Sequence, residues 1–341
     1  MKQRTEKKHR RRVFLLEGMV AVLFILLMIC LGGLLLAETG MRSSGLDEKQ
    51  TSAVPAADFS PPPETKPQST AGESRPPQSD ASAEPGWKFV SMPASALGRG
   101  DLVLVNGSRH FDASYAGTVN VFDNKTESYF VCSTGLYVSE RIMEALNGWL
   151  DAFSEETGTG NVNIIAGYRD FETQRDLYDR ALLNRGAEHA HSYLALPGYS
   201  EHHTGLAVDL GIYYPESGLS GDFTGTGVYR WLVEHAWEYG FIRRYPEGKS
   251  EITGISYESW HFRYVGAAHA YYMYSENLCL EEYIELLKNY PFDGEHLTVS
   301  CGGSVFEIYY CGGFEVAVPT SGEYLVSGNN CDGFIVTVEK E

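Results

Sequence analysis

The sequence contains few cysteines, six in 341 residues, and no two of them form a Cys-x-x-Cys pair. This spacing argues against a zinc ribbon built on cysteine pairs. Cys30 lies in a long apolar run, and five cysteines follow it: Cys132, Cys279, Cys301, Cys311 and Cys331. Five is an odd number, so at least one of them stays unpaired or bonds to another molecule. Buried free thiols explain the others at least as well as disulfides do.

Basic residues are also scarce. The chain has 27 Lys and Arg against 45 Asp and Glu, which gives a net charge of −18. Residues 1–12 hold seven of the basic residues and one glutamate, so the remainder carries a net charge of −24. A nucleic-acid-binding domain shows a basic face, and this acidic body therefore argues against a nucleic-acid partner.

Charge is absent from the twenty residues Gly18–Ala37. Twenty residues of helix span about 30 Å, the thickness of a bilayer core. The basic block before this run places the N-terminus in the cytoplasm and the rest of the chain outside the cell membrane. The sequence thus predicts a single-pass anchor over residues 13–37. A cleaved signal peptide is the alternative, although its apolar region is usually about 7–15 residues long.

Residues 38–86 have too little apolar sequence to fold. They contain eight of the fourteen prolines among Ser, Ala, Thr and Glu. Such a composition predicts a disordered linker. A flexible chain of this length reaches roughly 40 Å and would hold a folded domain away from the membrane.

The folded sequence begins near Trp87. A strand is expected over Asp101–Asn106, and apolar residues at helical spacing predict a helix from about Val138 that Gly158 ends. The next segments are a strand over Asn161–Ala166, a helix through Leu183 and a loop over 186–199 whose histidines we interpret as loop residues. The elements expected after this loop are Leu206–Tyr213 (strand), Val228–Tyr239 (helix), Phe241–Tyr245 and Trp260–Val265 (strands), and Ala267–Tyr274 and Leu280–Asn289 (helices).

From Asp293 onward the sequence is rich in Val, Ile, Tyr and Phe between Gly and Asn turns, which predicts four strands. Fifty residues are few for an independent core, so this appendix either packs on the preceding domain or forms a small sandwich. The chain thus divides into a cytoplasmic basic tail (1–12), a transmembrane anchor (13–37), a disordered linker (38–86), a main folded domain (87–291) and a β-rich appendix (292–341).

Potential metal ligands occur in two compact segments. His202 and Asp209 flank Gly205 in the first, and His261 ends the second. Two imidazoles and one carboxylate suit a catalytic zinc with an open fourth position. His203 is the alternative ligand of the first segment, because neighbouring residues on a strand face opposite ways.

Two charged residues suit catalysis beside such a metal. Glu258 lies three residues before His261 and can take a proton from the attacking water and pass it to a leaving amine. Arg169 stands at a strand-to-helix turn and can stabilise a developing oxyanion. Without a catalytic role, Glu258 would be a surface acid in a loop and Arg169 would form a structural salt bridge.

Four ordered segments resemble the VanY-type D-alanyl-D-alanine carboxypeptidases, zinc peptidases of the LAS group (peptidase family M15B). The segments are Gly167-Tyr168-Arg169 with Gln174, Ser200-x-His202-x-x-Gly205-x-Ala207-x-Asp209, Phe241-Ile242-x-Arg244-Tyr245-Pro246-x-Gly248-Lys249, and Glu258-x-Trp260-His261. The resemblance covers roughly residues 95–275. It implies an α+β fold, similar to that of hedgehog domains and D,D-peptidases, with a central antiparallel sheet and flanking helices.

The resemblance also implies roles. His202, Asp209 and His261 would bind Zn²⁺, Glu258 would act as general base and then acid, and Arg169 would stabilise the transition state. Gln174 and Ser200 would help to bind the terminal D-residue of the substrate, a peptidoglycan stem peptide, or the carboxylate of that residue.

Two positions depart from the family pattern, where serines are usual: Ala166 and Asp170. The extra negative charge at Asp170, beside Arg169, could weaken binding of the substrate carboxylate. The alternatives to D,D-carboxypeptidase activity are an L,D-carboxypeptidase acting on tetrapeptide stems and a zinc-containing wall-binding or sensor module without catalysis. The presence of Glu258 speaks against the last, because binding zinc does not require it.

Overall fold

A computed structural model describes residues 86–111 and 117–340 of the chain. The expected basic tail, anchor and all but the last residue of the linker lie outside these residues. Among the helices that the structure does describe, none combines the length and the apolar character needed to cross a membrane.

The central sheet has six strands. Their order is β3 (Phe130–Val131), β5 (Val162–Ala166), β6 (Ala207–Tyr214), β9 (His261–Tyr264) and β8 (Phe241–Arg243), with β7 (Leu219–Asp222) paired to β6. All pairs are antiparallel except β3–β5. The expected antiparallel sheet is therefore present in its centre, and the short parallel edge strand makes the whole sheet mixed.

Helix α3 (Met143–Thr157) packs its apolar face on this sheet. Trp149, fully buried, stacks on Phe241 at a centroid distance of 5.1 Å and meets Phe262 edge-on at 4.9 Å. Gly158 ends the helix in the left-handed conformation, as predicted, with φ +70. The helix starts later than expected, because Val138 belongs to β4 (Tyr137–Ser139) and a 3-10 turn precedes α3.

The loop expected over 186–199 contains a helix, and that prediction was wrong. After α4 (Phe171–Arg185), Gly186 adopts φ +85 and α5 (Ala187–Tyr193) follows directly. Gly186 therefore joins two helices, in a positive-φ conformation that glycine adopts without strain. His189 and His191 therefore lie on α5.

The strand expected over Asp101–Asn106 is also absent from the described structure. Leu102–Val105 are buried, but Asp101 and Leu102 lie in a turn and only Asn106 forms a bridge, with Arg109. Side chains replace a sheet partner here, because Arg263 donates from Nη2 to the carbonyl oxygens of Asp101 and Val103, each at 2.9 Å.

Several short elements complete this part of the chain. They are β2 (Thr118–Asn120), which pairs with β4 (Tyr137–Ser139), α2 (Val121–Asn124), α6 (Arg230–His235) and α7 (Ser250–Thr253). The helix expected over Val228–Tyr239 is divided, since 3-10 turns flank α6, and Gly240 ends it at φ +81.

The β-rich appendix shares a core with the domain before it. Its sheet has the order β10 (Leu297–Cys301), β11 (Ser304–Gly312), β14 (Gly333–Lys340) and β13 (Tyr324–Gly328). Apolar side chains of α8 (Ala267–Ser275) and α9 (Leu280–Leu287) join those of β10, β11 and β14 in one buried cluster. The appendix is therefore not a separate sandwich.

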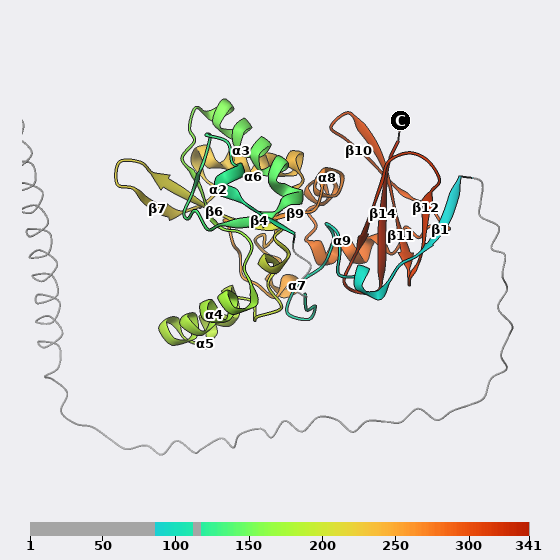
Figure 1. Ribbon diagram of the computed structural model, residues 1–341, viewed down its shortest axis with the longest axis horizontal. Coiled ribbons are helices and arrows are strands. Elements are labelled where there is room, and N and C mark those ends of the chain that lie inside the picture. Colours follow the sequence, from blue (N-terminus) through green and yellow to red (C-terminus); the bar gives the residue numbers. More distant parts are fainter. Residues whose placement is uncertain (1–85, 112–116, 341) are drawn as a thin grey trace, which may run out of the picture. The chain divides into compact units, whose positions relative to one another are not determined.

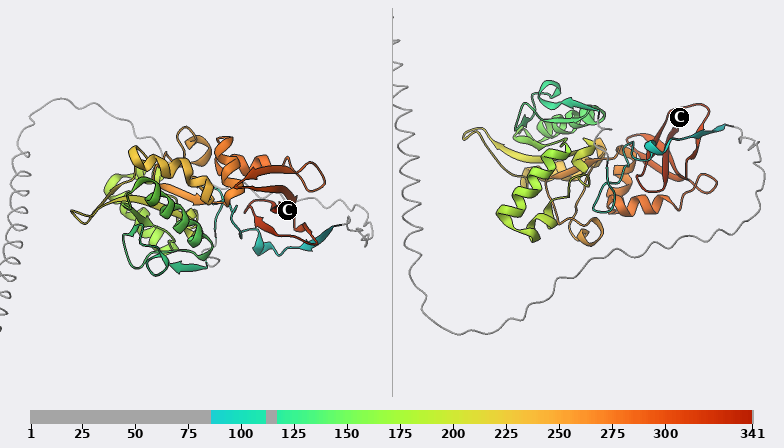
Figure 2. Two further views of the ribbon diagram at one scale, coloured as in Figure 1. Left: turned by 90° about the horizontal axis from the view of Figure 1, so that it is seen from above. Right: turned by 60° about the horizontal axis from the view of Figure 1, so that its bottom comes forward.

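The first strand of the described chain pairs with a strand of the appendix. Strand β12 (Glu315–Pro319) pairs with β1 (Trp87–Ser91) in a separate two-stranded sheet (Figures 1 and 2). The first folded residues are therefore held by the C-terminal appendix. The five cysteines within the described residues form no disulfide.

Candidate metal and catalytic centre

Strand register brings two of the three expected metal ligands together. Asp209 on β6 is the direct partner of His261 on β9. Facing side chains of such a pair lie close, and Asp209 Oδ1 is 2.9 Å from His261 Nδ1.

A tight turn brings the third ligand. His202 lies in a 3-10 turn (Glu201–Thr204) that Gly205 ends at φ +69, directly before β6. A Cβ at Gly205 would lie 2.8 Å from the backbone nitrogen of Ser139, so only glycine fits there. Nδ1 of His202 bonds to the carbonyl oxygen of Gly167 at 2.6 Å, which turns its Nε2 to within 3.3 Å of Asp209 Oδ2.

These three residues fit a metal ion. One ligand atom from each lies within 4.8 Å of the others, and all three residues are buried. His202 Nε2 and Asp209 Oδ1 have no hydrogen-bond partner within the described chain, and buried polar atoms rarely stay unpartnered. Two imidazoles and a carboxylate are the donors of a three-ligand catalytic zinc site.

The electrostatics of the two histidines differ. Burial, aided by nearby Arg169, lowers the pKa of His202 to about 4, which keeps its imidazole neutral. Burial also acts to lower the pKa of His261, but the nearby carboxylates of Asp209 and Glu201 outweigh it and raise the pKa to about 9. The carboxylates around His261 thus favour a positive charge at this position, whether a proton or a metal ion.

His203, the alternative ligand, faces away from the centre. Its Nδ1 bonds to the carbonyl oxygen of Arg169 at 2.7 Å, and its Nε2 accepts from the backbone N–H of Gly198 at 2.9 Å. Both ring nitrogens are used, so His203 is a structural residue of the turn.

Glu258 stands beside the three ligands. Its Oε2 is 3.7 Å from His261 Nδ1, and the residue is 5% exposed. Its backbone N–H donates to the carbonyl oxygen of Tyr245 at 3.1 Å, which fixes the loop before β9. Burial raises the pKa of Glu258 to about 7, close to the value that suits a group exchanging protons at neutral pH.

Arg169 reaches the centre from the end of β5. Its Nη2 is 3.4 Å from Asp209 Oδ2, and its Nη1 donates to Gln174 Oε1 at 3.0 Å. Burial lowers the pKa of this guanidinium, but arginine remains protonated at neutral pH. Gln174 also donates from Nε2 to the carbonyl oxygen of Ala195 at 2.7 Å, so both ends of its amide are occupied by protein groups.

Asp170, a departure from the family pattern, has a structural partner. Its side chain accepts from the backbone N–H of Thr173 at 2.7 Å and caps the N-terminus of α4. Its charge is therefore directed to the helix end.

A cavity of about 860 Å³ opens onto the metal centre. Its wall includes all seven expected site residues, together with residues of α4 and α5 that the motifs did not indicate. These additional residues include Leu177, Arg185, His189 and Tyr193. A cavity of this size lies within the range of small-molecule sites.

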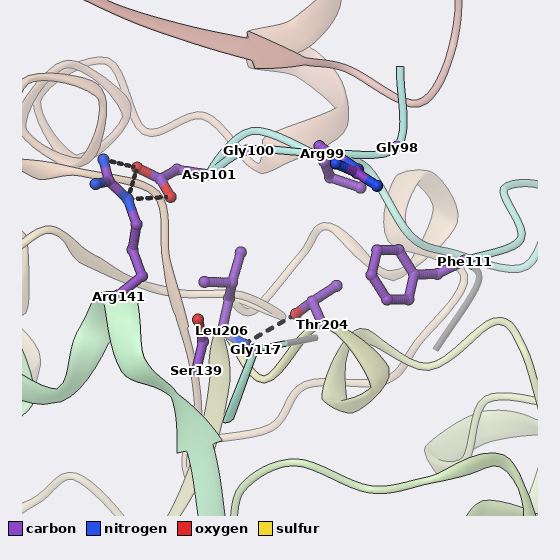
Figure 3. Close-up of a pocket in the computed structure, with 11 residues that line it drawn as sticks. Gly98, Arg99, Gly100, Asp101, Phe111, Gly117, Ser139, Arg141, Thr204 and Leu206 are labelled. Atoms are coloured by element: carbon purple, nitrogen blue, oxygen red, sulfur yellow. Dashed lines mark hydrogen bonds and ion pairs between the residues drawn. The ribbon is translucent and has the colours of Figure 1, made fainter. Parts of the chain in front are cut away.

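A second cavity, of about 320 Å³, is lined by Thr204 and Leu206 near His202 and by Ser139 and Arg141 (Figure 3). Arg141 and Asp101, two of its lining residues, form a bidentate ion pair with Nη2–Oδ2 at 2.8 Å. Among its described lining residues Asp101 is the single carboxylate, and none is a histidine or cysteine. The first cavity is therefore the candidate active site.

Two imidazoles, a carboxylate, an adjacent glutamate and a buried arginine in one cavity define a metallopeptidase-type centre. The family profile "VanY: D-alanyl-D-alanine carboxypeptidase" matches residues 135–267. A D-alanyl-D-alanine carboxypeptidase from Enterococcus faecium is 36% identical over 248 residues, which are 70% of this chain and 75% of the relative. The chain belongs to this family.

Two further similarities agree. A D-alanyl-D-alanine carboxypeptidase from Enterococcus faecalis (strain ATCC 700802 / V583) is 36% identical over 57% of this chain and 71% of its own length. The crystal structure of the vancomycin resistance D,D-dipeptidase VanXYg, in complex with a D-Ala-D-Ala phosphinate analog, superposes with a TM-score of 0.65 at 32% identity. The superposition covers 74% of this chain and 99% of the chain in that structure.

Proposed function

We propose that this chain is a zinc-dependent D-alanyl-D-alanine carboxypeptidase that removes the C-terminal D-alanine from peptidoglycan stem peptides. The observation that carries the proposal is the meeting of His202, Asp209 and His261 with Glu258 in the wall of one cavity, in a chain of the VanY family. Binding of zinc alone would not need the nearby carboxylate of Glu258.

Zinc bound by these ligands supplies a Lewis acid that activates water and polarises the scissile carbonyl. Glu258 takes a proton from the attacking water and returns it to the leaving amine of D-alanine, a role that its raised pKa supports. Arg169 places its positive charge where the carbonyl oxygen becomes negative.

Gln174 and Ser200 have different parts in this proposal. Gln174 holds Arg169 through Nη1 and so acts on the substrate through the arginine. Ser200 is 4% exposed, lines the cavity just before His202, and is positioned to contact the terminal D-residue.

The chain would act outside the cell membrane. The uncharged run Gly18–Ala37 behind a basic block supports a single-pass anchor with a cytoplasmic N-terminus. The linker over 38–86 would then let the catalytic domain reach the cell wall. This arrangement agrees with a substrate that lies outside the cytoplasm.

The test uses the full chain, purified in detergent with one equivalent of zinc. It is incubated separately with a pentapeptide stem ending in D-Ala-D-Ala and with a tetrapeptide stem ending in one D-Ala, and free D-alanine is measured. Release from the pentapeptide alone is expected. Release from the tetrapeptide instead would show L,D specificity, and release from neither by zinc-loaded protein would reject the carboxypeptidase.

A further inference from the structure

The two ring nitrogens of His261 face different groups. Nδ1 faces the metal centre, 2.9 Å from Asp209 Oδ1. Nε2 faces away from it, 3.5 Å from Oε2 of Glu201. Both Nε2 and this Oε2 are buried, and neither has a hydrogen-bond partner among the residues described. Each atom is thus a candidate partner for the other.

Metal binding by His261 would explain why these two atoms face each other. A neutral imidazole that binds a metal through one nitrogen carries its proton on the other. Such a proton is almost always given to a carboxylate, a backbone carbonyl or water, which fixes the orientation of the ring. With Nδ1 of His261 at the metal, the proton on Nε2 points at Glu201.

Glu201 is itself held by two arginines. Its Oε1 accepts from Arg244 Nε and from Arg263 Nη1, both at 2.7 Å, and all three side chains are fully buried. These bonds occupy Oε1 and leave Oε2 for the histidine.

The arginines are fixed in turn. Arg263 lies two residues after His261 on β9, hence on the same face. The backbone N–H of Arg244 donates to the carbonyl oxygen of His261 at 3.1 Å. The guanidinium of Arg244 also binds Glu281 through two bonds, at 2.8 and 2.6 Å. Two carboxylates and two guanidiniums therefore form a neutral cluster whose free carboxylate oxygen points at the metal ligand.

From this geometry we propose that Glu201 is a positioning residue for the metal site. Its Oε2 accepts the Nε2 proton of His261 and so holds Nδ1 toward the metal. The inference rests on the zinc-dependent function proposed above and adds a residue that touches neither metal nor substrate.

Glu201→Gln is the sharpest variant. The two arginines hold the amide oxygen on their side, so the amide NH₂ faces the N–H of His261, and two donors oppose each other. We expect zinc affinity, measured by competition with a chromogenic chelator, to fall about 10–100-fold. The visible absorption of the Co²⁺-substituted protein is expected to change, because the imidazole is no longer held.

Glu281→Gln is the matched control. It removes the same charge from the same cluster but does not face His261. It is expected to lower the midpoint of thermal unfolding while zinc affinity and the Co²⁺ spectrum stay those of the wild type. Wild-type affinity and spectrum in Glu201→Gln would overturn the proposal, and so would an equal loss of affinity in both variants.

Glu201→Asp keeps the test decisive if the glutamine variant does not fold. It retains the charge for both arginines but shortens the reach to Nε2, so weaker zinc binding is expected in a folded protein, and wild-type binding would overturn the proposal. None of these readouts needs D-alanine release. An inactive wild type that loses zinc on Glu201→Gln would refute the carboxypeptidase and leave the positioning role intact.

Discussion

Asp209 and His261 are direct partners across β6 and β9, with Oδ1 and Nδ1 2.9 Å apart. Two of the three metal ligands are therefore set by the register of two central strands rather than by loops. A slip of β9 by one residue against β6 would turn His261 to the other face of the sheet, away from Asp209. Metal binding and the integrity of this strand pair must be coupled.

Removal of the metal is therefore expected to lower stability. At a free zinc concentration 1,000 times the Kd, binding adds about 4 kcal/mol to the free energy of unfolding. For a domain of this size, that corresponds to a midpoint roughly 10 °C higher. Thermal unfolding with a chelator, and again after zinc is restored, measures the effect. In Asp209→Ala, zinc should leave the midpoint unchanged, and a wild-type response there would mean that the ion binds elsewhere.

Replacement of Glu258 separates catalysis from metal binding. Glu258→Gln keeps the shape of the side chain but removes the group that exchanges the proton, so kcat should fall about 10²–10⁴-fold. Zinc content, measured by atomic emission, should stay at one per chain. Glu247→Gln changes an exposed glutamate on the same connection and serves as the control. Turnover by Glu258→Gln at the control rate would show that another group is the base.

Much of the centre could be predicted from the sequence because its residues stand in short segments with characteristic spacing. His202, Asp209 and His261 were expected together, and the structure brings them together. Glu201 could not be singled out, because nothing in the spacing shows that the residue before His202 faces the back of His261. Its role depends on Arg244 and Arg263, which reach it only through the fold.

The parts of the fold that the sequence did not predict also depend on partners distant in the chain. The segment Asp101–Asn106 has the pattern of a strand, yet the carbonyl groups of Asp101 and Val103 accept from the buried guanidinium of Arg263 instead of a neighbouring strand. The pairing of β1 with β12 joins segments more than two hundred residues apart. Local patterns carry no information about such long-range partners.

Replacement of Asp170 tests whether its negative charge weakens substrate binding. Because its carboxylate caps α4, Asp170→Ala should cost about 1 kcal/mol of stability, whereas Asp170→Ser can cap and should cost little. KM for the pentapeptide should stay unchanged in both variants. Urea unfolding and steady-state kinetics measure the two effects. A lower KM in both would show instead that the aspartate repels the substrate carboxylate.

The buried imidazole of His269 is expected to make stability depend on pH. It lies between the hydroxyl of Tyr283, 2.8 Å from Nδ1, and that of Thr337, 2.9 Å from Nε2, and so joins α8 to β14. Burial lowers its pKa from about 6.5 to about 4. The unfolded chain thus binds this proton more readily than the folded one, and the stabilisation is complete above pH 6.5 and declines as the pH falls toward 4.

The pKa difference corresponds to about 3 kcal/mol of unfolding free energy lost between pH 6.5 and 4. His269→Asn removes this titration, so its stability should fall less over the same interval, although it starts lower because the bonds to Tyr283 and Thr337 change. Urea unfolding of both proteins at half-unit steps of pH gives the two slopes. Because every other titrating group is shared, the difference between the slopes isolates His269, and parallel curves would show that this imidazole takes up its proton equally well in the folded chain.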